Sequence, residues 1–154
     1  MKKKLLLIQP TPYDQYGKLV KKKKLYFVGL ALPLLAALTP DDFEVELCYE
    51  TIEDVPFDTD AELIGISSMG HAVMRTIDIA KKFKELGKTV ILGGYMVSLM
   101  PEEAKKYADA VMIGDSEETW GEMINDYLNG TPNSFCKAFC DELYKEYVVY
   151  EKEI

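Results

Sequence analysis

The stretch Leu63–Gly94, LIGISSMGHAVMRTIDIAKKFKELGKTVILGG, decides the fold because it contains a complete strand–helix–strand unit. Its ends, Leu63–Ile66 and Val90–Leu92, are short apolar runs, typical of strands buried on both faces of a parallel sheet. Apolar residues between them recur at helical steps of four and three, and Gly87 is placed to end the helix. These residues are Val73, Ile77, Ala80 and Phe83. The unit predicts two parallel strands joined by a right-handed crossover.

Three more strands extend this unit. Leu5–Ile8 and Ala110–Ile113 are apolar runs of the same kind. The segment Phe43–Glu50 instead alternates, which is typical of an edge strand with one wet face. Phe43, Val45, Leu47 and Tyr49 form one face, and Glu44, Glu46, Cys48 and Glu50 form the other. We therefore predict an α/β fold: a flavodoxin-like (Rossmann-type), doubly wound, five-stranded parallel sheet with strand order 2-1-3-4-5.

The predicted elements occupy most of the first 130 residues. Strands are expected at 3–9, 43–49, 62–67, 88–93 and 110–114, and helices at 30–38, 70–86, 101–107 and 117–129. The helix over 30–38 is apolar nearly all round and should be well covered. Asp115 and Glu118 are expected to cap the last helix. Residues 1–130 form the predicted domain, and residues 131–154 are a C-terminal tail, packed on the domain or part of a truncated linker.

Composition limits the function classes. The chain has 18 Lys and Arg against 26 Asp and Glu, a net charge of −8, and three cysteines. The acidic balance argues against nucleic-acid and membrane partners, and the odd cysteine count and the lack of a signal-peptide pattern favour a cytoplasmic protein. Residues 1–24 nevertheless carry +7, with four lysines at Lys21–Lys24. That run is either a solvated loop or a cationic lip over an anionic ligand.

A ligand site is expected at the carboxyl ends of the strands, where the strand order reverses. Small residues follow three strands at this edge: Ser67 and Ser68, Gly93 and Gly94, and Gly114. Each alone could be a helix cap or a tight turn. Together they leave room for a large ligand to approach the backbone.

Three common uses of this fold do not match. A phosphorelay receiver needs acids after the first strand, an Asp ending the third and a Lys ending the fifth; Gln9-Pro10, Ser67 and Gly114-Asp115 stand there instead. A flavodoxin needs a hydroxyl- and glycine-rich loop where Thr11–Asp14 lies. The G-x-G-x-x-G of dinucleotide folds is absent after the first strand.

The remaining pattern resembles the cobalamin-binding domain found N-terminal in many radical SAM proteins. Four stretches carry the resemblance: Leu6–Pro10, Gly29–Leu38, Ile64–Met69 and Gly114–Thr119, the last resembling the family's GEGE turn. The separation between Ser67 and the glycine pair also suits the family's spacing. The resemblance covers about residues 1–130.

The resemblance implies a corrinoid ligand whose dimethylbenzimidazole base binds between the carboxyl ends of the strands. By position, the serine that hydrogen-bonds the dimethylbenzimidazole is Ser67, and the glycines that line the tail are Gly93 and Gly94. The implied cofactor-binding set is Gln9, Pro10, Thr11, Ser67, Ser68, Met69, Gly93, Gly94, Tyr95, Gly114 and Asp115.

Two departures from related proteins shape the expected chemistry. The D-x-H-x-x-G motif that supplies a lower cobalt ligand is missing, so we expect base-off cobalamin with no protein ligand to the metal. The single histidine, His71, is a candidate for a place near cobalt. Cys136 and Cys140 have the first interval of a radical SAM cluster motif, but Leu143 stands at its third position. We expect no catalysis by this chain alone.

The sequence thus predicts a corrinoid-binding domain that positions cobalt for methyl transfer or a radical reaction by a partner, such as a radical SAM or methyltransferase protein. One alternative is a degenerate interaction domain that has lost the cofactor. It would dock through Leu25–Leu38 and the tyrosines of the tail. A weaker alternative is a flavin or nucleotide site in the same cleft.

Overall fold

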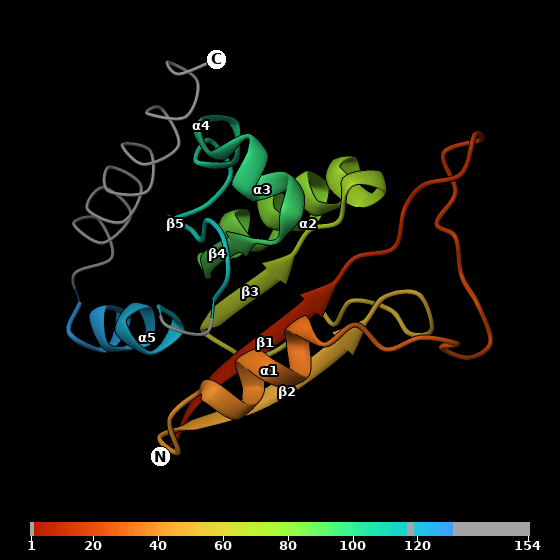
Figure 1. Ribbon diagram of the computed structural model, residues 1–154. Coiled ribbons are helices and arrows are strands. Elements are labelled where there is room, and N and C mark those ends of the chain that lie inside the picture. Colours follow the sequence, from red (N-terminus) through yellow and green to blue (C-terminus); the bar gives the residue numbers. More distant parts are fainter. Residues whose placement is uncertain (1, 117–118, 131–154) are drawn as a thin grey trace.

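The computed structural model describes residues 2–116 and 119–130 and contains one parallel sheet (Figure 1). The five strands lie in the order β2-β1-β3-β4-β5, and every neighbouring pair is parallel. They are β1 (Lys3–Gln9), β2 (Phe43–Tyr49), β3 (Leu63–Ser67), β4 (Thr89–Gly93) and β5 (Ala110–Val111). The predicted fold class and strand order are confirmed.

Helices cover both faces of the sheet. Helix α1 (Ala31–Leu38) and helix α5 (Trp120–Leu128) lie on one face, with β1 sending Leu5 and Leu7 into the core beneath them. Helix α2 (Val73–Glu85) and helix α4 (Pro101–Ala104) lie on the other, where Leu6 and Ile8 are buried. Successive side chains of a strand point to opposite faces, so a continuous apolar run fills both cores.

The segments around the carboxyl ends of β4 and β5 differ from the prediction. A short helix, α3 (Tyr95–Leu99), follows β4 directly and was not predicted. The strand predicted over 110–114 ends after two residues, and Gly114 has a positive φ of +76°. An extended strand does not accommodate that φ, which glycine adopts readily. The chain therefore leaves the sheet early and turns toward α3.

Two helix starts also need correction. The helix predicted over 70–86 begins as a 3₁₀ turn, η1 (Gly70–Ala72), before α2. Helix α5 begins at Trp120 with Thr119 as its N-cap residue, so Asp115 does not cap it. Glu118, the predicted capping partner, lies outside the described residues, as do Cys136 and Cys140.

Helix α1 is much less covered than predicted. Only Leu32 of this helix is fully buried, and the preceding Leu30 is 79% exposed. The helix packs on β1 along one side only, which leaves apolar side chains open toward the carboxyl edge of the sheet.

The prediction that one face of β2 is exposed to solvent is wrong at the carboxyl end of the strand. Glu44 and Glu46 are exposed as expected, but Cys48 and the following Glu50 are buried. Glu50 is buried as an ion pair: its Oε1 accepts hydrogen bonds from Arg75 Nε at 2.9 Å and Nη2 at 2.5 Å. Its Oε2 accepts the backbone N–H of Thr11 at 3.1 Å. A charged group can be buried when it is paired and hydrogen-bonded in this way.

Burial raises the pKa of the Cys48 thiol to about 12, with further contributions from the Glu53 and Glu50 carboxylates. The thiolate is the reactive species, so in a Cys136→Ser/Cys140→Ser background we expect Ellman's reagent at pH 8 to react with the native protein about 1000-fold more slowly than with the unfolded chain. Because the unfolded thiol loses its proton first, stability should also fall as the pH rises from 9 toward 12. Rapid labelling of the native protein would contradict this burial.

Among the described residues, no helix has the length and apolar character needed to cross a bilayer.

Candidate functional site

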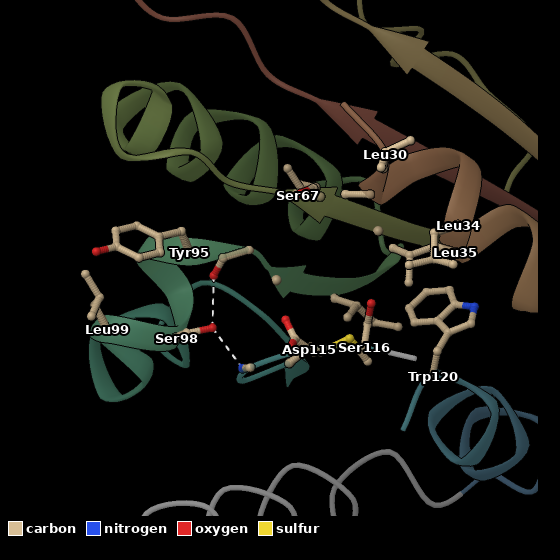
Figure 2. Close-up of a pocket in the computed structure, with 18 residues that line it drawn as sticks. Leu30, Leu34, Leu35, Ser67, Tyr95, Ser98, Leu99, Asp115, Ser116 and Trp120 are labelled. Atoms are coloured by element: carbon tan, nitrogen blue, oxygen red, sulfur yellow. Dashed lines mark hydrogen bonds between the residues drawn. The ribbon is translucent and has the colours of Figure 1, made fainter. Parts of the chain in front are cut away.

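A cavity of about 500 Å³ opens at the carboxyl edge of the sheet, on the side covered by α1 and α5 (Figure 2). One wall is formed by Leu30, just before α1, and by Leu34 and Leu35 of α1, and Trp120 of α5 lies beside them. The opposite wall comes from α3, through Tyr95, Ser98 and Leu99. The ends of β3, β4 and β5 form the floor. Cavities of roughly 300–1,000 Å³ are typical of small-molecule and cofactor sites.

Two glycines keep the floor in place. A Cβ placed on Gly65 would come within 2.7 Å of Leu7 Cδ2 and 3.8 Å of the Trp120 ring. A side chain here would therefore clash with Leu7, and Gly65 itself lines the cavity floor. Gly94 has φ +98°, and its Cβ would lie 2.6 Å from the Ser68 backbone oxygen. Only glycine combines that φ with such a close approach of two strand ends.

Ser98 connects the two loops of the α3 wall. The backbone N–H of Gly114 donates to Ser98 Oγ at 2.9 Å, and Ser98 Oγ donates to the carbonyl oxygen of Gly94 at 3.1 Å (Figure 2). One hydroxyl thus fixes the end of β4 relative to the turn after β5. Ser98 was not among the predicted site residues, since a serine in an unpredicted helix carries no distinctive pattern.

Replacing Ser98 with Ala should reduce the free energy of unfolding by about 1 kcal/mol, because both hydrogen bonds are lost. Urea denaturation followed by circular dichroism measures the change. Ser116→Ala is a matched control on the same cavity, since the described structure gives the Ser116 side chain no hydrogen bond to lose. Equal stability of the two variants would show that the Ser98 bridge does not hold the loops together.

The wall formed by α1 is fixed by Trp120, the only tryptophan of the chain. Trp120 is buried, and its Nε1 donates to Thr39 Oγ1 at 2.9 Å, which ties the start of α5 to the end of α1. The cavity therefore has walls held by hydrogen bonds on both sides. Sequence periodicity placed Trp120 only in the apolar stripe of its helix.

The cavity lining is mostly apolar. Asp115 is the one charged side chain among the described residues that line it. Ser67 lines the cavity (Figure 2), and no hydrogen bond between described residues uses its hydroxyl. This combination suits a neutral, mainly apolar group that needs one hydrogen-bond donor.

The structure brings together about half of the predicted cofactor-binding residues. The following line the cavity: Ser67, Gly93, Gly94, Tyr95, Gly114 and Asp115. The others, which lie outside the lining, are Gln9, Pro10, Thr11, Ser68 and Met69.

The residues outside the lining have other environments. Gln9 ends β1 with its side chain against Gly29, and Pro10 is buried. The Thr11 N–H donates to Glu50, as described above, and Ser68 Oγ accepts a hydrogen bond from Thr76 Oγ1 at 3.0 Å on the α2 side of the sheet. Met69 is half-exposed. The side chains of two successive strand residues, such as Ser67 and Ser68, lie on opposite faces of the sheet, so only one of the two serines lines the cavity.

His71 is exposed in η1 and does not line the cavity. Within residues 2–116 and 119–130, no group of three His, Cys, Asp or Glu side chains could hold a metal ion.

The sequence of this chain is similar to a known family and to known proteins. The family described as "B12 binding domain" matches residues 24–124. The bacteriochlorophyllide d C-8(2)-methyltransferase of Chlorobaculum tepidum is 37% identical over 101 residues, which are 65% of this chain and 22% of that protein. The bacteriochlorophyllide d C-12(1)-methyltransferase of the same organism is 28% identical over 139 residues, which are 89% of this chain and 30% of that protein. The chain thus spans less than a third of the length of either relative.

Proposed function

The chain belongs to the B12-binding domain family, and from this premise we propose that its cavity holds the dimethylbenzimidazole base of cobalamin, detached from cobalt. The observation that carries the proposal is the cavity itself: a floor of strand-end glycines between two fixed walls, with Ser67 in its lining. Ser67, Gly93 and Gly94, to which the resemblance assigns the base and the tail, are among the lining residues.

The residues present fit this group. Dimethylbenzimidazole is a flat, neutral, largely apolar heterocycle with one ring nitrogen that accepts a hydrogen bond once it leaves the metal. Ser67 Oγ is a donor without a protein partner among the described residues, and Leu34 and Trp120 offer apolar contact. A buried ring nitrogen left without a donor would cost about 1–3 kcal/mol. Ser67 is therefore the residue that would orient the base.

The remaining lining residues have supporting roles. Gly93 and Gly94 would let the base and its ribose approach the strand ends without a side chain between them. Tyr95 and Leu99 stand at the exposed rim of α3, where they would contact the rest of the corrinoid. We assign no protein ligand to cobalt, because the D-x-H-x-x-G motif is missing from the sequence.

The bound corrinoid would supply cobalt as a methyl carrier or radical partner, and the protein would supply position and a site shielded from water. Both relatives are methyltransferases by name, and this chain spans less than a third of each. These two facts support a division of labour in which this domain holds the cofactor. A methyltransferase or radical SAM portion, on the same or another polypeptide, would then perform the reaction.

Titration with hydroxocobalamin, followed by gel filtration and absorbance, tests the cofactor assignment. We expect the corrin bands to shift and to co-elute with the protein. Cobinamide, which lacks the nucleotide tail, is the matched ligand control and should bind at least about tenfold more weakly, since it leaves the cavity empty. Equal binding of the two corrinoids would show that the base does not enter the cavity, and binding of neither would favour an interaction domain.

A further inference from the structure

The segment Lys21–Leu30, KKKKLYFVGL, is an exposed surface unlike the rest of the molecule. It has four lysines and no acidic residue, whereas the chain as a whole carries −8. Its apolar side chains are also exposed: Tyr26 by 78%, Phe27 by 81% and Leu30 by 79%. Exposed aromatic and leucine side chains beside a lysine cluster mark an interaction site more often than isolated exposed residues do. We call Lys21–Leu30 the basic–aromatic segment.

The cavity does not account for this exposure. Within the segment only Leu30 lines the cavity, and Lys21–Val28 lie outside it. A dimethylbenzimidazole base in the cavity would therefore not contact Tyr26 or Phe27.

The segment is held at its start and projects from there. Lys21 Nζ forms a salt bridge with Asp54 at 2.9 Å and donates to the Glu50 carbonyl oxygen at 2.7 Å. The Lys22 N–H donates to the Thr51 carbonyl oxygen at 2.7 Å. Beyond this anchor the long connection between β1 and α1 stands away from the sheet (Figure 1). The salt bridges found between described residues use none of Lys22, Lys23 and Lys24, and the Lys24 ammonium lies over the ring of Tyr26 within the same segment.

We propose that the basic–aromatic segment binds the surface of an anionic lipid bilayer. These three lysines would contact lipid phosphates, and Tyr26 and Phe27 would enter the boundary between headgroups and acyl chains, where aromatic side chains are favoured. A bilayer surface offers both of these layers to an extended peptide. An acidic protein partner would match the charges but would need a separate apolar pocket for each ring.

The acidic body of the protein does not prevent this contact. At physiological ionic strength the Debye length is about 8 Å, so charges farther than this from the membrane are largely screened. A projecting loop acts through its own charge. The net charge of the whole chain, which argued against a membrane partner, averages this segment with the acidic remainder.

Co-sedimentation with vesicles tests the proposal. The full chain should pellet with vesicles of phosphatidylcholine and phosphatidylglycerol, remain in the supernatant with phosphatidylcholine alone, and be released by high salt. Each lysine near such a surface contributes about fivefold to partitioning, so Lys23→Glu/Lys24→Glu should lower binding by at least about 25-fold. Phe27→Ser should weaken binding at constant charge.

Lys81→Glu/Lys82→Glu on α2 is the matched control and should bind vesicles nearly as well as the parent chain. It makes the same charge change at two exposed lysines. Each double variant also loses one cation–π contact: the control loses that of Lys81 over Tyr107, at 5.2 Å, and the test variant loses that of Lys24 over Tyr26, at 5.0 Å. Equal loss in both variants, no binding to the anionic vesicles, or binding to soluble polyglutamate instead would each overturn the proposal. Hydroxocobalamin binding should be unchanged by Lys23→Glu/Lys24→Glu, so the two proposals can fail separately.

Discussion

Replacing Ser67 with Trp should reduce cobalamin affinity by at least about 100-fold, or about 2.7 kcal/mol. Ser67 lines the cavity (Figure 2), so an indole at this position would occupy the space assigned to the dimethylbenzimidazole and remove its hydrogen-bond donor. Isothermal titration with hydroxocobalamin measures the loss. The circular dichroism spectrum should stay that of the parent chain.

Glu62→Trp is the matched control for this experiment. Glu62 is exposed and lies at the opposite end of the same strand, just before β3, so an added indole there should leave affinity unchanged. Normal cobalamin affinity of a folded Ser67→Trp protein would contradict the placement of the base.

Replacing Arg75 with Met should lower the free energy of unfolding by about 3–5 kcal/mol. Glu50 is fully buried, and Arg75 provides its only ion pair among the described residues. Removing the guanidinium leaves a buried carboxylate with the Thr11 N–H alone, a far larger penalty than the loss of a surface pair. Urea unfolding gives the difference, with Lys4→Met, which breaks the exposed Lys4–Asp60 pair, as a control of much smaller effect.

A second substitution distinguishes the buried charge from lost packing. Glu50→Gln combined with Arg75→Met removes both charges and should recover part of the stability lost in Arg75→Met alone. If the double variant is no more stable than the single one, the cost comes from packing around the arginine stem instead.

The sheet could be predicted because it depends on local patterns. The apolar runs at Leu5–Ile8 and Leu63–Ile66 identify strands buried on both faces, and the helix between β3 and β4 fixes them as parallel. The strand-end position of Ser67, Gly93, Gly94 and Gly114 then follows from topology, and all four line the cavity.

What could not be predicted depends on contacts between distant segments. The alternation in β2 assigned Glu50 to a wet face, since nothing near it in the sequence shows that Arg75 lies opposite. The apolar character of α1 suggested that its side chains are fully buried. In the structure, several of them line the cavity instead. The Ser98 bridge joins two loops whose positions depend on the whole fold.

The central claim is that the cobalamin base leaves cobalt and enters the cavity between α1 and α3. Electron paramagnetic resonance of cob(II)alamin bound to the protein tests this directly, because a nitrogen ligand splits each cobalt line into a triplet. We expect the triplets of free cob(II)alamin to disappear when the protein is added and to persist when the Ser67→Trp variant is added. The claim would be contradicted if the triplets remain after the parent chain is added while the field positions of the cobalt lines shift, since that shift shows that the corrinoid is bound.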